Sequence, residues 1–299
     1  MLQTQIAAYK VCIRAEGESE FDVCAIRDVM PALNHHRERT TRLYHIRTDR
    51  DHIGDAMLNV ENLHVEVDGK EVIHGVNLRI PVGETHVLMG PNGSGKTTLL
   101  RSIMGFSNYT VTEGQITFRG RDVTNLPLHQ RARYGMGLMF QRPPTISGLK
   151  LGKLLDVMSG GNPTKAHEYA EMMNMNSFLD RDLNANFSGG EIKRSEVLQL
   201  MVQQPDFVML DEPESGVDLE NIVLIGKAIA QLVEKDRHIV NRKKSGLIIT
   251  HTGFILDYLE ADTGHMLCNG EIRCHGNPRE ILKVIKERGY QECIECAII

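Results

Sequence analysis

The stretch that decides the fold runs Gly90-Pro91-Asn92-Gly93-Ser94-Gly95-Lys96-Thr97, and it matches the pattern G-x-x-x-x-G-K-[ST] in full. Glycines in such a loop let backbone N–H groups converge on phosphate oxygens, and the positive end of the following helix points at the same place. The lysine supplies a charge for the β- and γ-phosphates, and the threonine hydroxyl is a ligand for Mg²⁺. A short apolar strand over residues 85–89 precedes the loop and a helix over residues 97–104 follows it, which is the context that the pattern requires.

Outward from this loop, predicted strands alternate with predicted helices. Short apolar runs at residues 137–140, 207–210 and 246–250 indicate buried strands, and residues 219–235 indicate a helix. Residues near 150–202 are mostly helical in pattern, with Asn162 as the N-cap and Pro163 as the first helical residue of one helix. The alternation predicts an α/β fold with a largely parallel sheet covered on both faces and a helical insertion at about residues 143–203.

The character of the chain changes near Met57. Residues 1–56 show no sustained periodicity, whereas apolar residues at near-alternate positions from Leu58 to Val67 predict a strand, and Asp68-Gly69 predicts a hairpin turn after it. We therefore expect a folded domain over residues 57–299 and an unstructured extension before it, or translation that begins at Met57. A regulatory or targeting arm is the alternative interpretation of the extension.

The composition excludes several classes of protein. The 299 residues carry 34 Lys and Arg against 39 Asp and Glu, a net charge of −5, and 41% are hydrophobic. These values are typical of a globular protein and give no electrostatic reason to expect nucleic acid as a partner. No apolar run approaches the roughly 18 residues of a membrane span, and no secretory signal is recognisable, so we expect a cytoplasmic protein with reduced thiols and no membrane insertion of its own.

Polar residues that follow three of the predicted strands complete a nucleotide site. Asp211 and Glu212 come directly after the apolar run at residues 207–210, where a carboxylate is expected to hold nucleotide-bound Mg²⁺ and its neighbour to polarise the attacking water. Gln141 follows another strand and is placed to reach the Mg²⁺ or the water. His251 follows a third and is placed to hydrogen-bond a γ-phosphate.

A second anion-binding pattern lies far from the phosphate loop. Ser188-Gly189-Gly190-Glu191 begins a helical run, and small residues at a helix start expose N–H groups and a hydroxyl to an anion. Two helix N-termini so far apart in one chain do not easily surround one phosphate, whereas two copies of the chain can complete each other's sites.

Taken in order, these motifs resemble those of the ABC superfamily of ATPases. Residues Gly90–Thr98 resemble its Walker A motif, with Thr98 included, and Asp211-Glu212 its Walker B pair; Gln141 resembles its Q-loop, Ser188–Glu191 its signature, Ser215-Gly216-Val217-Asp218 its D-loop and His251 its switch histidine. The resemblance implies a P-loop fold with an antiparallel N-terminal β part, and hydrolysis of MgATP. It also implies a head-to-tail dimer with two ATP molecules between Walker A of one copy and the signature of the other. The family often stacks adenine on an aromatic residue, where this chain has Val67.

The text after the signature distinguishes branches of the superfamily. Glu191-Ile192-Lys193-Arg194-Ser195-Glu196 is similar to the SufC group, the ATPases of the Suf system for iron–sulfur cluster assembly. Ser215–Asp218, the run Phe254–Leu259 and Gly148 also resemble that group, whereas Pro213-Glu214 is closer to transporter ATPases. This resemblance implies a scaffold partner of SufB or SufB/SufD type, contacted around Pro143–Leu155.

Three rivals remain to be weighed. A transporter ATPase docked on a membrane permease has the same hydrolytic residues, and Lys193–Glu196 counts against it. A non-transport protein of translation or DNA repair usually has two ATPase domains or a long insertion, which this chain lacks. A binding module that has lost hydrolysis conflicts with the presence of Glu212 and His251.

The pair Cys293 and Cys296, with Cys274-His275, is a weak pattern for Zn²⁺ or iron, and we expect ordinary thiols there.

Overall fold

The computed structural model describes residues 56–160 and 162–295. The expected extension therefore lies outside the described residues except for Ala56, the first residue of strand β1, as do Gly161 and Cys296. None of the helices in the described part of the chain combines the length and apolar character that crossing a bilayer requires. The side chains are described only as far as Tyr290, which leaves out that of Cys293; among them, no three His, Cys, Asp or Glu converge as metal ligands.

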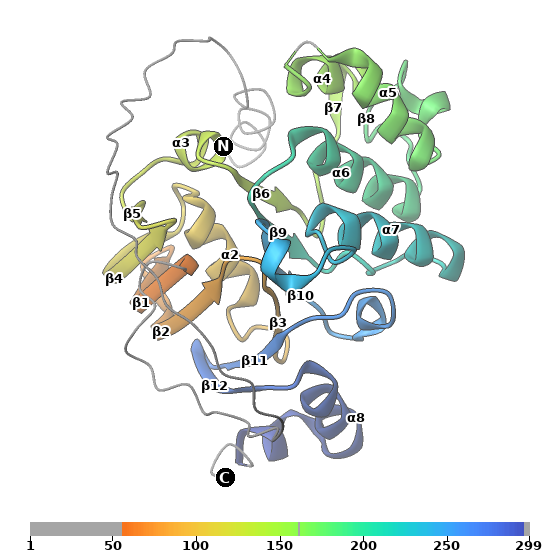
Figure 1. Ribbon diagram of the computed structural model, residues 1–299. Coiled ribbons are helices and arrows are strands. Elements are labelled where there is room, and N and C mark those ends of the chain that lie inside the picture. Colours follow the sequence, from red (N-terminus) through yellow and green to blue (C-terminus); the bar gives the residue numbers. More distant parts are fainter. Residues whose placement is uncertain (1–55, 161, 296–299) are drawn as a thin grey trace, which may run out of the picture.

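A six-stranded sheet forms the centre of the molecule (Figure 1). Its strand order is β12-β11-β3-β10-β9-β6, and neighbouring strands are parallel except for the β11–β12 hairpin. The strands span Thr85–Met89 (β3), Met136–Met139 (β6), Phe207–Asp211 (β9), Ser245–Ile249 (β10), Thr263–Cys268 (β11) and Glu271–Gly276 (β12). The predicted strands are thus found, and the parallel order brings the carboxyl ends of β3, β6, β9 and β10 to one edge.

The parallel strands are buried on both faces, which explains why apolar residues dominate them and why the polar residues of β3, β9 and β10 stand at or near strand ends. Along β9, Val208 and Leu210 belong to one hydrophobic core, whereas Phe207 and Met209 belong to the other. The first core is closed by helices Gly189–Gln203 (α6), Leu219–Leu232 (α7) and Pro278–Glu295 (α8), and α8 is interrupted at Gly289. The second core lies against helix Lys96–Met104 (α2).

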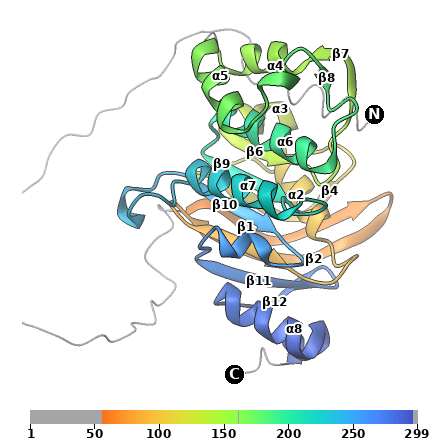
Figure 2. The same ribbon diagram turned by 90° about the vertical axis from the view of Figure 1, so that its right-hand side faces the viewer.

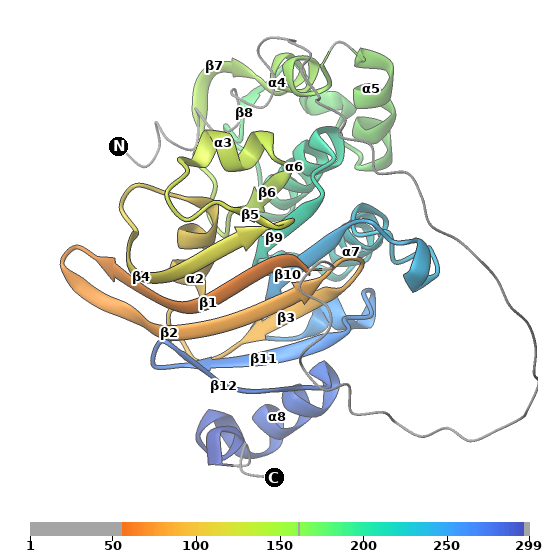
Figure 3. The ribbon, with the colours of Figure 1, turned by 60° about the vertical axis from the view of Figure 1, so that its left-hand side comes forward.

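A second, antiparallel sheet of order β2-β1-β4-β5 covers α2 on its other side (Figure 3). Its strands are Ala56–Val67 (β1), Lys70–Pro81 (β2), Thr110–Phe118 (β4) and Arg121–Asp122 (β5). The predicted hairpin is present, because Asp68 and Gly69 both have positive φ, as a tight two-residue turn requires. The register of β1 against β2 shifts between Val60 and Leu63, which is why the apolar spacing changes from two to three there. Strands β4 and β5 were not predicted.

The helical insertion extends from the central sheet on the side of β6, and it shares the first hydrophobic core with the sheet (Figure 2). It contains helices Leu151–Met158 (α4) and Pro163–Met172 (α5), the short pair Ile146–Lys150 (β7) and Asp182–Leu183 (β8), the 3-10 turn Asn176–Phe178 and α6. Asn162 accepts a hydrogen bond from the Lys165 N–H, and Pro163 is the first helical residue of α5, as predicted. The β7–β8 pair was not predicted, because strands this short have no detectable period.

The remaining elements are helix Leu128–Arg133 (α3) and two 3-10 turns, Ile239–Asn241 and Phe254–Asp257. The prediction that the helix after the D-loop extends to Lys235 was wrong, since α7 ends at Leu232. Glu234 adopts a left-handed conformation (φ 57°), and its carboxylate accepts hydrogen bonds from the backbone N–H groups of Lys243 and Lys244. The Lys235 N–H bonds to the Ala230 carbonyl oxygen across this left-handed residue, so a local cap ends the helix and the carboxylate contact holds Glu234 in place.

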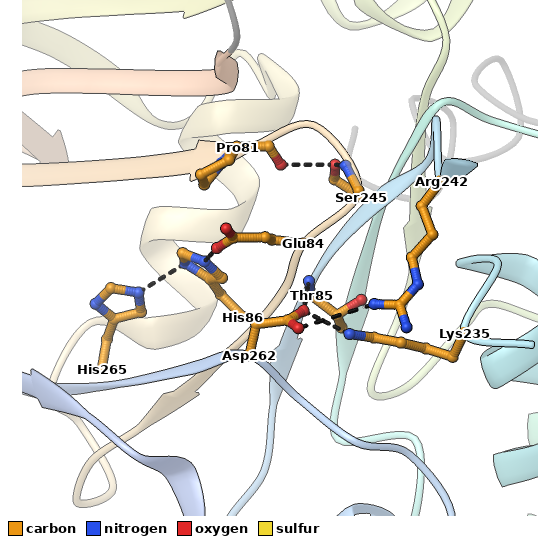
Figure 4. Close-up of polar contacts among 10 residues, drawn as sticks. Pro81, Glu84, Thr85, His86, Lys235, Arg242, Ser245, Asp262 and His265 are labelled. Carbon is orange, nitrogen blue, oxygen red and sulfur yellow. Dashed lines mark hydrogen bonds and ion pairs between the residues drawn. The ribbon is translucent and has the colours of Figure 1, made fainter. Parts of the chain in front are cut away.

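Polar contacts join the loops at the opposite edge of the central sheet, where its parallel strands begin (Figure 4). The Asp262 carboxylate accepts hydrogen bonds from the Thr85 N–H at 2.7 Å and from the Lys235 ammonium at 2.5 Å. The His86 ring lies between Glu84 and His265, with contacts of 2.9 Å on each side. Burial, together with the neighbouring imidazoles, lowers the pKa of His265 to about 3, so this histidine is neutral at physiological pH. The network secures the edge that faces away from the phosphate loop.

Candidate functional site: the nucleotide site

The phosphate loop connects β3 to α2 and depends on glycines at two tight positions. A Cβ on Gly90 would lie 2.1 Å from the Leu267 carbonyl oxygen, and one on Gly95 would lie 2.8 Å from the Ile73 side chain. Gly90, Gly93 and Gly95 all have φ values between 78° and 153°, a region that side chains rarely adopt. The backbone can therefore form a cradle of this shape only with these residues.

Lys96, the first residue of α2, lies inside the loop with only 6% of its surface exposed. Its ammonium donates hydrogen bonds to the carbonyl oxygens of Gly90 at 2.9 Å and Pro91 at 2.8 Å. Burial lowers the pKa of Lys96 to about 8, against the opposing effect of the Glu212 and Asp211 carboxylates. A phosphate group in the loop offers this cation a negative partner in place of neutral carbonyls.

Two of the three residues predicted to hold Mg²⁺, Thr97 and Asp211, are in contact. The Thr97 hydroxyl donates a hydrogen bond to Asp211 Oδ2 at 3.0 Å, and Asp211 Oδ1 is buried without a hydrogen-bond partner among the described residues. Burial raises the pKa of Asp211, and the Thr97 hydrogen bond opposes that shift. A buried, unsatisfied carboxylate oxygen beside a hydroxyl fits a hard cation. Thr97, Asp211 and Gln141 would hold it, and Mg²⁺ in that place would neutralise phosphate charge.

Glu212 is held between the two other predicted catalytic residues. Its Oε2 accepts a hydrogen bond from Gln141 Nε2 at 2.7 Å, and its Oε1 lies 2.9 Å from His251 Nε2. The three residues follow β6, β9 and β10, which are neighbours in the sheet, so their proximity comes from strand order. Burial, and then the charge of Lys96, lowers the pKa of His251, which favours the neutral ring; in that form Nε2 carries the proton that it donates to the carboxylate. The arrangement orients a carboxylate as a base is oriented.

A further carboxylate, Glu214, was missed in the sequence. It is 6% exposed, and its Oε1 accepts hydrogen bonds from the hydroxyls of Thr250 and Thr252, the two residues that flank His251. Burial raises the pKa of Glu214. The sequence signal for this residue was only that an acid follows Glu212 by two positions. The burial of Glu214 and its hydrogen-bond partners become visible only in the fold. Glu214 thus positions the His251 loop.

Glu212 and Glu214 line a cleft of about 760 Å³. Its walls include Gln141, Glu212 and His251, the D-loop residues Ser215–Asp218, and Phe254. Asp218 also caps α7 by accepting a hydrogen bond from the Asn221 N–H at 2.9 Å. The D-loop therefore leads directly from the cleft into α7.

The signature begins α6 as predicted, but it does not line this cleft. The Ser188 hydroxyl accepts a hydrogen bond from the Glu191 N–H, while the Glu191 carboxylate accepts one from the Ser188 N–H at 2.6 Å. A Cβ on Gly189 would lie 2.9 Å from the Gly216 carbonyl oxygen, so the signature packs on the D-loop of its own chain. The structure thus unites the Walker motifs, Gln141 and His251, and leaves the signature outside that group.

Comparison with known proteins agrees with this geometry. A profile described as "ABC transporter" matches residues 73–215. A "Probable ABC transporter ATP-binding protein" of Streptococcus pyogenes serotype M3 is 36% identical over 248 residues, which cover 79% of this chain and 94% of that protein. The chain belongs to the ABC ATPase family. "Vegetative protein 296" of Bacillus subtilis is 37% identical, covering 79% of this chain and 92% of that protein. The "Probable ATP-dependent transporter ycf16" of Cyanidium caldarium is 36% identical, and the match covers 79% of this chain and 96% of that protein.

Solved structures show the same ABC ATPase fold. The ADP conformation of MJ1267, described as an ATP-binding cassette of an ABC transporter, superposes with a TM-score of 0.64 at 25% identity, covering 80% of this chain and 98% of that one. A dimeric post-hydrolysis state of the cassette MJ0796, bound to ADP and phosphate, has a TM-score of 0.63 at 21% identity, covering 75% and 99%. The predicted fold class is therefore confirmed.

Proposed function

We propose that this ABC ATPase binds and hydrolyses MgATP and uses the energy to change the conformation of a soluble Suf scaffold on which iron–sulfur clusters are built. The observation that carries hydrolysis is the Glu212 carboxylate, held by Gln141 and His251 at the open end of the phosphate loop. Glu212 takes the proton of the attacking water, and Lys96 stabilises charge on the transferred phosphoryl group.

Hydrolysis on this proposal takes place in a head-to-tail dimer. The signature of the same chain packs on its own D-loop and does not line the cleft, so a second copy is needed to bring Ser188–Glu191 onto the nucleotide. The N–H groups at the start of α6 suit the γ-phosphate of the partner's ATP. Each copy would then supply one half of each site.

The Suf assignment rests on the sequence from Glu191 to Glu196 and on its resemblance to the SufC group. The scaffold, of SufB or SufB/SufD type, would dock around Pro143–Leu155. This segment directly follows Gln141 and includes β7, whose residues are half-buried or exposed. A partner bound there would sense the position of Gln141, and through it the state of the nucleotide.

A membrane permease is the second candidate partner. The relatives named above as transporter ATP-binding proteins favour it, and so does the pair Pro213-Glu214. In that case every hydrolytic residue keeps its role, and only the partner differs.

The test is a pull-down of the tagged protein from a gentle lysate, combined with phosphate-release measurements on the purified protein. Turnover that requires Mg²⁺, together with a membrane-free partner of Suf scaffold type, is the expected result. Recovery of a polytopic permease as the partner would refute the Suf assignment. Hydrolysis would be refuted if the purified wild-type protein released no phosphate from ATP, both alone and with the recovered partner.

A further inference from the structure

Two charged side chains on α6 are almost completely buried, although helix α6 also carries the exposed signature at its start. Lys193 is 3% exposed and Glu196 is 2% exposed, and they lie three residues apart on one face of the helix. Burying a lysine or a glutamate is costly unless its charge is matched by hydrogen bonds. The contacts of these two residues therefore indicate what the helix is built to hold.

Both side chains contact the main chain at Phe140 and Gln141. The Lys193 ammonium donates hydrogen bonds to the Gln141 carbonyl oxygen at 2.9 Å and to the Phe140 carbonyl oxygen at 3.4 Å. The Glu196 carboxylate accepts a hydrogen bond from the Phe140 N–H at 3.4 Å. Helix α6 thus binds two carbonyls and one amide of the short segment that leaves β6.

The segment held in this way carries the residue that orients the catalytic carboxylate. Gln141 donates its side-chain amide to Glu212 at 2.7 Å, while its carbonyl accepts from Lys193. Contacts therefore run from the start of α6 through Lys193 and Gln141 to Glu212. Burial lowers the pKa of Lys193, and the carboxylates of Glu196, Asp211, Glu212 and Glu214 oppose that shift.

The neighbouring cation on the same helix has a different target. The Arg194 guanidinium donates hydrogen bonds to the carbonyl oxygens of Met173 and Asn174, at the end of α5, at 3.0 and 3.1 Å. Lys193 and Arg194 thus anchor α6 in opposite directions, one to the segment after β6 and one to the helical insertion. Arg194 is a matched control for Lys193.

We propose that Lys193, assisted by Glu196, is a positioning residue that connects the signature helix to the catalytic site by holding the main chain of Gln141. When the start of α6 engages a nucleotide, movement of the helix is transmitted to Gln141, and so to Glu212, through this contact. This proposal rests on the proposed function, because the effect of Lys193 on turnover can be measured only if the protein hydrolyses ATP.

The first test is a double-mutant cycle of Lys193→Met and Gln141→Ala, measured as kcat and KM for ATP. Because Lys193 acts through Gln141, we expect Lys193→Met to lower kcat about tenfold or more, with KM changed less than threefold. The double variant should then be no slower than the slower single variant. In the control cycle of Arg194→Met and Gln141→Ala, the fold-reductions of kcat in the two single variants should multiply in the double variant. Multiplying effects in the Lys193 cycle would overturn the proposal.

The second test does not depend on turnover. Hydrogen exchange of the backbone amides of residues 138–146 should be at least fivefold faster in Lys193→Met than in wild type, and unchanged in Arg194→Met. Lys193→Gln keeps a hydrogen-bond donor without the charge, so it should restore part of the protection against exchange. If Lys193→Met does not fold, Lys193→Gln replaces it in both tests. Equal exchange in all proteins overturns the proposal whether or not the wild type hydrolyses ATP. Loss of wild-type turnover with faster exchange refutes only the proposed function.

Discussion

Replacement of Glu212 by glutamine tests the proposed catalytic site most directly. In the wild type, the two carboxylate oxygens accept hydrogen bonds from Gln141 at 2.7 Å and from His251 at 2.9 Å. Glutamine has the same length, but only its carbonyl oxygen accepts, so one of the two donors loses its partner. The side chain also loses the ability to take a proton from water. The substitution therefore changes the chemistry while it preserves the volume.

The expected magnitude follows from these two losses. General-base catalysis contributes about 10²–10⁴-fold to a rate, so kcat should fall by that factor, which corresponds to about 2.7–5.4 kcal/mol of activation free energy. One lost hydrogen bond at a half-buried position lowers the free energy of unfolding by about 1 kcal/mol. Nucleotide binding should change little at pH 7, because Lys96, Thr97 and the loop amides remain.

The assay is phosphate release under saturating MgATP, with nucleotide affinity and size-exclusion chromatography measured on the same samples. The variant should bind ATP and accumulate as an ATP-bound dimer. Glu168→Gln, at an exposed position on α5, is the matched control and should turn over like wild type. Turnover of Glu212→Gln within threefold of wild type would show that Glu212 is not the base.

Other predictions concern the phosphate loop and the signature. Lys96→Ala should weaken ATP binding about 10- to 100-fold in a fluorescent-nucleotide titration, because it removes a charge-assisted contact. Since burial lowers the pKa of Lys96 to about 8, the lysine is charged below that pH and loses its proton above it; the dissociation constant for ATP should therefore rise up to tenfold per pH unit above pH 8, and Lys96→Arg should abolish this slope. Ser188→Arg should block the ATP-dependent dimer in size-exclusion chromatography while monomer binding persists, whereas Ser188→Ala, which loses only the helix cap, should still dimerise. Gly90→Ala places a Cβ 2.1 Å from the Leu267 carbonyl oxygen and should lower the free energy of unfolding by about 3 kcal/mol or more, whereas Gly93→Ala meets no atom within 4 Å and should cost only about 1 kcal/mol; similar denaturation midpoints for the two would contradict this.

The sequence predicted those elements whose signals are local. The strand over Thr85–Met89 has the predicted bounds, because its apolar residues Val87–Met89 lead directly into the glycine-rich loop. The hairpin turn at Asp68-Gly69 is also present, since the left-handed conformations there demand such residues. The end of α7 was mispredicted, because a glutamate gives no signal for the left-handed cap that Glu234 forms, and amides nine and ten residues later hold its carboxylate.

Within the site, the sequence by itself determined the phosphate loop, the capped start of α6 and the acids at the end of β9. Each depends on neighbours within one turn or one strand, and so its pattern is written in consecutive residues. Only the tertiary structure decided that Gln141 contacts Glu212 across 71 residues, that Glu214 holds both sides of His251, and that Lys193 reaches back 52 residues to the Gln141 carbonyl. The first two contacts follow from the order of parallel strands in the sheet, which brings distant strand ends to one edge, and the third follows from the packing of α6 on β6. No local pattern encodes either arrangement.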